Sequence, residues 1–396
     1  MKKKTPLVIV FITVFIDLMG FGIVIPILPT FASNELGISD TGIGIIIAVY
    51  SLMQFVFNPL LGKLSDRYGR KKIIAYSLLV TAASYVLFSF SVNFLLLFTA
   101  RMLAGIGGSN IGAAQAYIAD VTTEEDRAFG MGLIGAAFGL GFVFGPLLGG
   151  LMADLGYIYI GLFSAGFSLL AFLFAVLFLP ESLKEKNKAA KISFSVVDVE
   201  LFKKAFKMKF VGLLIILLFV AVFSISNIYG TFNLIAYRKY GLTEREIGYQ
   251  FALMGISFSI VQMFLLKHLT NIFSEKLLFM GSLIILGVTL TMIPYSGNFW
   301  GLAIVMMVMH IGSGIIQPVS FSMISKLSPE NEQGAILSVN QSMASLARVI
   351  GPVWGGLTFD YLGMEFPFLT GGVFVFVTIL LTILAISKNL LFVEKD

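Results

Sequence analysis

The stretch GKLSDRYGRKK occupies residues 62–72 and lies between two apolar runs, 43–61 and 73–90. Five of its eleven residues are basic and one is acidic, although only 12% of the chain is charged. Two apolar runs this close leave a turn too short to form a domain, so its charges are expected to act at a membrane surface. The positive-inside rule explains the lysines and arginines. It does not explain Asp66, or the glycines Gly62 and Gly69.

The composition is that of a polytopic membrane protein. The chain has 396 residues, of which 58% are hydrophobic, and its mean hydropathy is +0.94, more than a soluble core uses. The absence of cysteine and the presence of only two histidines exclude thiolate and histidine-rich metal sites, so we expect no metal and no cofactor. A net charge of +5 does not by itself indicate nucleic-acid binding. The apolar run after Lys2–Lys4 has no small-residue cleavage site and is interpreted as a retained first helix.

The apolar runs predict an all-α protein with twelve transmembrane helices. Lysine and arginine placement predicts that both termini are cytoplasmic. Of the 27 basic residues, 22 fall in segments that would be inside, 3 fall in outside loops, and Arg101 and Arg348 fall within helices. The predicted helices span 7–29, 42–62, 72–91, 94–118, 130–153, 158–180, 211–234, 246–266, 276–294, 299–323, 334–357 and 366–388.

The two halves of the chain repeat. A shift of 206 positions places Gly145-Pro146 on Gly351-Pro352, and Gly149-Gly150 on Gly355-Gly356. The repeat predicts two pseudo-symmetric six-helix bundles around a central cavity that opens by rocking. We expect an N-terminal bundle at 1–183, a cytoplasmic basic linker at 184–209 and a C-terminal bundle at 210–396. The linker is expected to carry a short amphipathic helix on the inner leaflet, as a tether or a lipid sensor.

The pattern G-x-L-x-D-R-x-G-R-K-K at 62–72 resembles the signature loop between helices 2 and 3 of the major facilitator superfamily. The resemblance implies that Arg70 pairs with Asp120 and that Asp66 lies against the start of helix 11. A carboxylate at a helix N-terminus is favoured by roughly 0.3–1 kcal/mol. These contacts would form a cytoplasmic gate that holds the outward-open state, made of Gly62, Asp66, Arg67, Gly69, Arg70 and Asp120.

Two charged residues inside predicted helices are candidates for proton coupling. Asp17 is the one carboxylate deep in the predicted spans, where a charge is expensive, so it should face the cavity or bind a proton. Residues 17–29 resemble the helix 1 motif of the drug/proton antiporters. Arg101, with Gly105 and Gly108, resembles the R-x-x-x-G-x-x-G motif that is implicated in proton transfer. The alternative for both residues is a purely structural hydrogen bond or ion pair.

Predicted helix 5 is rich in small residues between 135 and 150, which allows close helix packing. Its glycines and proline resemble the antiporter signature G-x-x-x-G-P-x-x-G-G, which is typical of exporters. The alternative is ordinary glycine packing, which says nothing about direction. The residues that carry the resemblance are Gly141, Gly145, Pro146, Gly149 and Gly150.

The first half of the chain resembles the tetracycline/proton antiporters, through residues 50–54, 58–70 and 138–146. It also departs from them. Their helix 3 carboxylate is replaced by Ser84, a helix 8 histidine by Phe258, and helix 9 has no carboxylate. These departures argue against tetracycline itself as the substrate, whereas the resemblance still implies proton-coupled efflux of an amphipathic compound.

Amide side chains inside the predicted helices are candidates for the substrate cavity. They lie among 39 phenylalanines and 17 methionines, a composition that suits amphipathic ligands. The alternative is lipid-facing phenylalanine with amides that join helices. The candidates are Gln54, Asn58, Asn110, Gln115, Asn227, Asn233, Gln317 and Gln341.

Together these features predict a proton-coupled efflux transporter of drugs or tetracycline-like antibiotics, with a role in antibiotic resistance. Its expected partners are the small-molecule substrate, protons and the lipid bilayer, and it is expected to act as a monomer in the cell (inner) membrane. No nucleophile triad, paired carboxylates or metal cluster in the sequence indicates an enzyme. Two alternatives remain open, an importer or facilitator of a small metabolite and a non-transporting membrane scaffold.

Overall fold

Where the structure describes the chain, its regular secondary structure is all helical. The computed structural model describes residues 5–183, 199–329 and 332–387, and no strand occurs among them. Eleven helical stretches in these residues are long and apolar enough to cross a membrane. Helix α16, Gln333–Tyr361, is 29 residues long but more polar in its first half, and it supplies the twelfth predicted helix. The predicted fold class is therefore confirmed.

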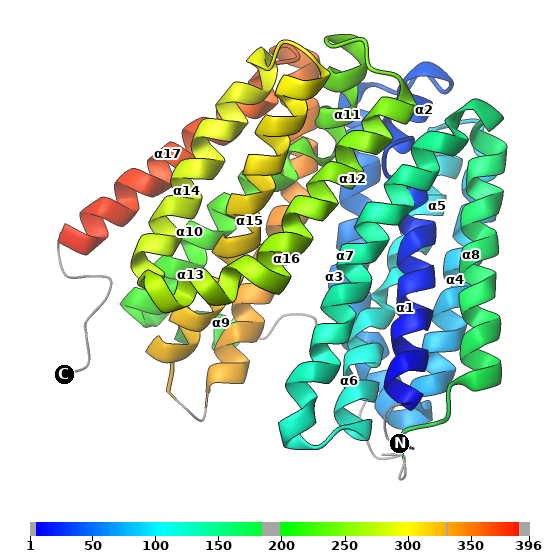
Figure 1. The fold of residues 1–396 in the computed structure, drawn as a ribbon, viewed down its shortest axis with the longest axis horizontal. Coiled ribbons are helices and arrows are strands. Elements are labelled where there is room, and N and C mark those ends of the chain that lie inside the picture. Colours follow the sequence, from blue (N-terminus) through cyan, green and yellow to red (C-terminus); the bar gives the residue numbers. More distant parts are fainter. Residues whose placement is uncertain (1–4, 184–198, 330–331, 388–396) are drawn as a thin grey trace. The chain divides into compact units, whose positions relative to one another are not determined.

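The helices form two compact units (Figure 1). The first contains Met1–Ile38, Val49–Val196 and Leu242–Gly255, and the second contains Ser39–Ala48, Val197–Gly241 and Ile256–Asp396. Each unit thus takes the beginning of one helix, α3 or α12, from the other half of the sequence. The helices are α1 Thr5–Val24, α2 Leu28–Asn34, α3 Asp40–Tyr68, α4 Arg70–Ser89, α5 Phe94–Gly107, α6 Ile111–Val121, α7 Glu124–Met152, α8 Tyr157–Phe178, α9 Val199–Lys207, α10 Lys209–Ser226, α11 Ile228–Arg238, α12 Glu244–Ile260, α13 Leu266–Ile272, α14 Glu275–Met292, α15 Phe299–Leu327, α16 and α17 Phe366–Ser387.

Several predicted helices are interrupted in the structure. The predicted helix 94–118 is α5 and α6, joined by the 3-10 turn Gly108–Asn110, and the predicted helix 211–234 is α10 and α11, which meet at Asn227. The predicted turn 62–72 is almost entirely helical, since α3 continues to Tyr68 and α4 begins at Arg70. Only Gly69 lies between them, with φ of 113°, a conformation that glycine adopts without steric cost.

In the first unit α1 packs against α7 and α8, and α4 packs against α5 and α8 (Figure 1). Their shared core includes Val10, Leu78 and Tyr117, each at most 1% exposed. In the second unit α14 packs against α15 and α17, and α10 packs against α16 and α17. Apolar side chains therefore fill the space between neighbouring helices of each unit, and polar residues inside them are exceptions that need partners.

The predicted amphipathic helix of the linker exists as α9. It packs against α10 and α16, and Lys204 forms an ion pair with Glu332 at 2.6 Å. The rings of Phe202 and Phe206 lie 6.4 Å apart on α9. Phe210, four residues further along the chain, already belongs to α10. The expected position of this helix on a lipid surface stays a prediction. The basic residues Lys2–Lys4, the linker lysines Lys184, Lys186, Lys188 and Lys191, and the terminal Lys388 and Lys395 lie outside the described residues.

Candidate functional site

Asp17 is buried in the first unit and is held by neutral partners. Its carboxylate accepts hydrogen bonds from the Asn110 side-chain amide at 3.2 Å and from the Ser168 hydroxyl at 3.1 Å, while its exposed fraction is 7%. The interruption between α5 and α6 places Asn110, and α8 supplies Ser168. Because neither donor is charged, a proton can be taken up at Asp17 without breaking an ion pair. Asn110, which was predicted to line the substrate cavity, binds Asp17, and its place in that cavity stays a prediction. Ser168 was not predicted.

Arg101 of α5 is as buried as Asp17, at 7% exposure. Its guanidinium carbon lies 4.4 Å from the centre of the Tyr50 ring and 5.9 Å from that of Phe21. Such cation–π contacts compensate part of the loss of hydration. Within the described parts of the chain its Nε has no hydrogen-bond partner, and no carboxylate forms an ion pair with it.

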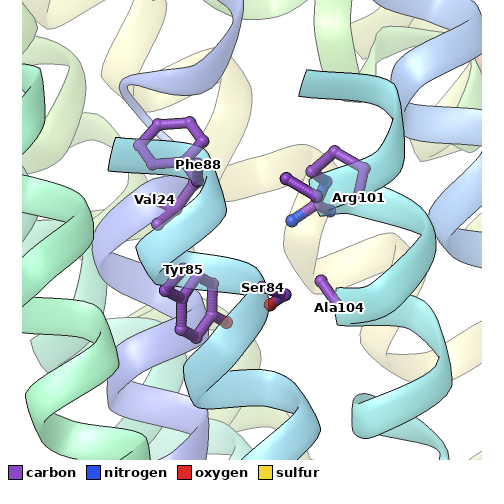
Figure 2. A pocket seen from close by; sticks show the side chains of 7 residues that line it. Val24, Ser84, Tyr85, Phe88, Arg101 and Ala104 are labelled. Atoms are coloured by element: carbon purple, nitrogen blue, oxygen red, sulfur yellow. The ribbon is translucent and has the colours of Figure 1, made fainter. Parts of the chain in front are cut away.

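Arg101 also lines a small pocket that Ser84 of α4 shares with it. Figure 2 shows the two side chains on neighbouring helices. The other lining residues are Val24, Tyr85, Phe88, Ala100 and Ala104. The surroundings of this guanidinium are therefore mostly apolar and aromatic.

Aromatic rings link the neighbourhoods of Asp17 and Arg101. Phe21, one turn after Asp17 on α1, stacks on Tyr50 with ring centres 5.1 Å apart. The side-chain amide of Gln54 donates to the Tyr50 hydroxyl at 3.0 Å and to the Gly108 carbonyl at 3.2 Å. Gln54, predicted as a cavity residue, thus belongs to this cluster. The predicted influence of Arg101 on Asp17 stays a prediction, since no direct bond joins them among the described residues.

A charged cluster surrounds Arg70 where α3 ends and α4 begins. Its guanidinium contacts Asp66 at 2.6 Å and Asp120 at 3.1 Å, and it donates to the Ser65 hydroxyl at 2.6 Å. The Arg70–Asp120 pair that the resemblance implies is therefore confirmed. Arg70 is only 8% exposed, so two carboxylates neutralise a buried cation here.

Two members of this cluster were not predicted from the sequence. Glu181 accepts a hydrogen bond from the backbone N–H of Arg70 at 2.8 Å, and Ser182 donates to Asp120 at 2.8 Å. Glu181 thus satisfies a free N–H at the start of α4. The available signal was the polar pair directly after predicted helix 6, which ends at the same predicted membrane face as residues 62–72.

The remaining predicted gate residues have simpler surroundings. The Arg67 guanidinium lies 5.5 Å from the Tyr68 ring centre. A side chain at Gly69 would collide with the Glu181 carboxylate. A Cβ at Gly62 would meet no atom of its own unit within 4 Å.

The small residues of α7 form its contact with α1. A Cβ at Gly145 would lie 2.6 Å from the Cα of Gly22, and one at Gly141 would lie 2.7 Å from the Cβ of Leu18. A side chain at Gly149 would overlap the carbonyl of Ile23. Only glycine permits this backbone approach.

The opposite edge of α7 contacts the beginning of α12. A Cβ at Gly150 would lie 3.0 Å from the Cα of Gly248, and one at Gly248 would lie 2.7 Å from the carbonyl oxygen of Pro146. We call the contacts of α7 with α1 and α12 the α7 seam. All five residues of the predicted antiporter motif lie in it.

The second unit contains a matching α16 seam. Side chains at Gly351 and Gly355 would collide with the backbone near Asn227, at the junction of α10 and α11. A side chain at Gly356 would collide with Asp40 at the start of α3. The positions that the 206-residue shift aligns thus make equivalent contacts.

The other predicted cavity residues have different surroundings. Asn227 donates to the Pro367 carbonyl at 3.0 Å, so it joins two helices, and Asn233 is fully buried. Two polar residues that were not predicted for the cavity bond within their own helices: the Arg348 guanidinium donates to the Ser345 hydroxyl at 3.1 Å, and the His310 ring bonds the Met306 carbonyl at 2.8 Å. Four of the predicted residues are exposed, namely Asn58, Gln115, Gln317 and Gln341.

Comparison with known proteins extends over nearly the whole chain. The family model of the Major Facilitator Superfamily matches residues 10–236 and 214–390. Multidrug resistance protein 1 of Bacillus subtilis (strain 168) is 31% identical over 387 residues, which cover 96% of each chain. The class H tetracycline resistance protein of Pasteurella multocida is 29% identical and covers 91% of this chain and 90% of its own.

The fold has solved counterparts as well. A crystal structure of a POT family transporter superposes with a TM-score of 0.80 at 15% identity, covering 96% of each chain. This likeness concerns the fold alone, whereas the family match and the relatives concern the sequence. The chain belongs to the major facilitator superfamily, and it is a multi-pass membrane transporter of small molecules rather than an enzyme.

Proposed function

We propose that this transporter exports small amphipathic compounds in exchange for protons, by alternating access of a central cavity. The observation that carries the proposal is Asp17, a buried carboxylate whose two hydrogen-bond donors, Asn110 and Ser168, are both neutral. A carboxylate in such surroundings is stable with a proton and expensive without one. It can therefore alternate between the two states as the site changes its access to water.

The α7 seam and the relatives support export as the direction of transport. The seam contains the whole antiporter motif of the sequence, and it joins α7 to both α1 and α12. Relatives are named for multidrug and tetracycline resistance, which supports export of drug-like compounds. We propose that the protein works as a monomer with both termini in the cytoplasm, and that 1–183 and 210–396 are its two bundles, joined by the linker 184–209.

The cluster around Arg70 is proposed to be the cytoplasmic gate. Arg70 keeps Asp66 and Asp120 together, so a carboxylate is held at the end of α3. In the outward-open state Asp66 would contact the start of α16 and thereby hold the two bundles together on the cytoplasmic side. Arg101 would respond to the charge of Asp17 through the rings of Phe21 and Tyr50.

Everted membrane vesicles with a pH-sensitive dye test the coupling directly. Adding a transported compound from a panel that includes tetracycline should release protons with the native protein, and Asp17→Asn should abolish this release. Thr13→Ala is the matched control, because Thr13 is also buried on α1 but bonds only the carbonyl of its own helix, at Ile9. Proton release that persists in Asp17→Asn would show that Asp17 is not the carrier. If no compound moves protons, metabolite uptake becomes the better hypothesis.

The accessibility of introduced cysteines to a thiol reagent tests the proposed cytoplasmic gate. The chain has no cysteine, so single cysteines introduced on either side of the membrane report accessibility without background. Asp66→Asn should shift labelling toward the cytoplasmic side and slow transport. Asp126→Asn, which removes an exposed carboxylate near the start of α7, should leave the labelling unchanged. Identical labelling for the native protein and Asp66→Asn would refute the latch.

A further inference from the structure

Two arginines in the first unit are equally buried but differ in their partners. Arg70 is 8% exposed and contacts two carboxylates, Asp66 and Asp120. Arg101 is 7% exposed, and in the described residues it makes no ion pair and leaves its Nε without a hydrogen-bond acceptor. A buried guanidinium without an anion is costly, and cation–π contacts replace only part of what an anion supplies. Arg101 is therefore a buried cation that the described part of the chain leaves without an anion.

The surroundings of Arg101 explain why none of the described residues supplies that anion. The neighbouring polar residue in the pocket is Ser84, whose hydroxyl is already donated to the Thr81 carbonyl at 2.6 Å. Asp17 is engaged by Asn110 and Ser168. Tyr50 presents the face of its ring to the guanidinium, and a ring face attracts a cation but cannot accept its proton as a carboxylate does.

We propose that Arg101 and its pocket form a subsite for the carboxylate group of an amphipathic, singly charged substrate. The inference rests on the proposed export function, and it narrows the substrate class. A single cation matches a single negative charge, and the planar guanidinium fork fits a carboxylate better than other small anions of equal charge.

The chemistry of the residues that line the pocket supports the same class. Apart from Ser84 and Arg101, its walls are Val24, Phe88, Ala100, Ala104 and the ring of Tyr85 (Figure 2). In this structure the space between these walls does not admit a water molecule, so a charged head group would reach Arg101 only when the helices move apart during transport. The rings of Tyr50 and Phe21, stacked 5.1 Å apart, lie beside the guanidinium, so an aromatic ligand body would meet aromatic neighbours there.

The test compares two pairs of ligands that differ only in charge. Naphthaleneacetate and naphthaleneacetamide share an aromatic body, and octanoate and octanamide share an acyl chain. Binding to the purified full-length protein in a nonionic detergent is measured by equilibrium dialysis, without a proton gradient. The native protein should bind at least one acid about tenfold more tightly than its amide, as a charge-assisted hydrogen bond predicts. A preference confined to the naphthalene pair indicates a drug-like aromatic acid, and one confined to the octanoate pair indicates a fatty acid from the membrane.

Three variants test the role of Arg101. Arg101→Met should bring acid and amide to equal affinity. Ser84→Asp should do the same while keeping the arginine, because it supplies an internal carboxylate to the same pocket. Ser84→Asn is the size-matched neutral control and should retain the preference for the acid. Thermal unfolding midpoints establish that each variant is folded, and Ser84→Asp decides the matter if Arg101→Met fails to fold.

The outcomes separate this inference from the proposed function. If the native protein shows no preference for either acid, or if the preference survives in Ser84→Asp, the carboxylate subsite is wrong. Compound-driven proton release in vesicles could still be intact in that case, and the export function would stand. An Arg101-dependent preference in a protein that moves no protons would instead support the subsite and refute the proton coupling.

Discussion

The α7 seam and the α16 seam are alike in backbone packing, but a carboxylate in one forms an ion pair and the corresponding carboxylate in the other accepts only neutral hydrogen bonds. In each seam, the start of a helix whose first residue is acidic contacts a glycine of α7 or α16. Asp40 begins α3 in the second unit, and Glu244 begins α12 in the first. The Asp40 carboxylate accepts hydrogen bonds from both terminal nitrogens of the Arg238 guanidinium, at 2.7 and 2.8 Å. The Glu244 carboxylate accepts hydrogen bonds from the Thr30 and Tyr157 hydroxyls, at 2.6 and 2.9 Å. It forms no ion pair within the described chain.

A second pair of carboxylates extends the comparison. Asp360 accepts hydrogen bonds from the backbone N–H groups of Asp40 and Thr41, at 3.1 and 2.7 Å, and so caps α3. Its counterpart at a shift of 206, Asp154, pairs with the exposed side chain of Arg245. The repeat has thus kept the glycines, which fix how close two backbones come, while the charges have diverged. We infer that the α16 seam is held by the ion pair between the buried Asp40 carboxylate and the partly exposed Arg238, and the α7 seam by the neutral hydrogen bonds of Glu244.

Removing the charge of Asp40 should give the largest effect. Asp40→Asn leaves the Arg238 guanidinium opposite a neutral amide, and the Asp40 side chain is only 9% exposed. We expect the free energy of unfolding to fall by about 3 kcal/mol, because the two charge-assisted hydrogen bonds from the partly exposed Arg238 to the Asp40 carboxylate are lost. Denaturant titration of the purified protein in detergent measures it. A loss as small as that of Glu244→Gln would remove the contrast between the seams.

Adding a methyl group to either seam should cost less, and equally in both. Gly149→Ala would collide with the Ile23 carbonyl and Gly355→Ala with the Asn227 carbonyl. Each should lower the free energy of unfolding by about 2 kcal/mol, since overpacking forces the helices apart. The same denaturant titration compares them with Gly135→Ala and Gly334→Ala, where a Cβ meets nothing within 4 Å. Strongly unequal losses would show that the seams are not equivalent in packing.

Much of this arrangement could be predicted from the sequence. Apolar runs located the twelve helices, because each membrane span needs a long stretch of apolar residues. The isolation of Asp17 within such a run marked it as a functional candidate, and the internal repeat located the glycines of both seams. These signals are local, or they depend on self-similarity of the chain, and both can be seen in one sequence.

The unpredicted contacts join residues that are distant in sequence. Glu181 bonds the backbone of Arg70, which lies 111 positions earlier, and Ser168 bonds Asp17 across 151 positions. The break after α5, which turns Asn110 toward Asp17, falls at Gly107 and Gly108, which are weak helix formers that the prediction of one continuous helix 94–118 did not take into account. The continuation of α3 to Tyr68 was not predicted, because a run of charged residues such as 62–72 is typical of a loop. In the structure these charges lie at helix ends, where Arg70 pairs with Asp66 and Asp120.

Glu244→Gln should be nearly neutral. Its side-chain carbonyl can still accept the hydrogen bonds of Thr30 and Tyr157, and no cation loses a partner. We expect a change of less than about 1 kcal/mol in the free energy of unfolding. Glu244→Leu provides the contrast, because it removes the acceptor that the Thr30 and Tyr157 hydroxyls share and should destabilise clearly more. A loss for Glu244→Gln comparable to that for Asp40→Asn would mean that Glu244 is held by charge after all.

The smallest effect is expected at Lys239 and Glu365, an exposed ion pair of the second unit that tests whether burial gives the Asp40 pair its strength. The hydrogen bond from Lys239 holds the pKa of the Glu365 carboxyl below its ordinary 4.5. A carboxyl whose pKa is depressed by folding stabilises the protein above its unfolded pKa, and this contribution is lost as the pH falls through the folded value.

Glu365→Gln should therefore lower the thermal midpoint slightly at neutral pH. The difference from the native protein should vanish below about pH 4 and shrink in about 1 M salt. The double variant with Lys239→Met should behave like Glu365→Gln alone. A difference that grew on acidification would mean that Glu365 acts through something other than its charge.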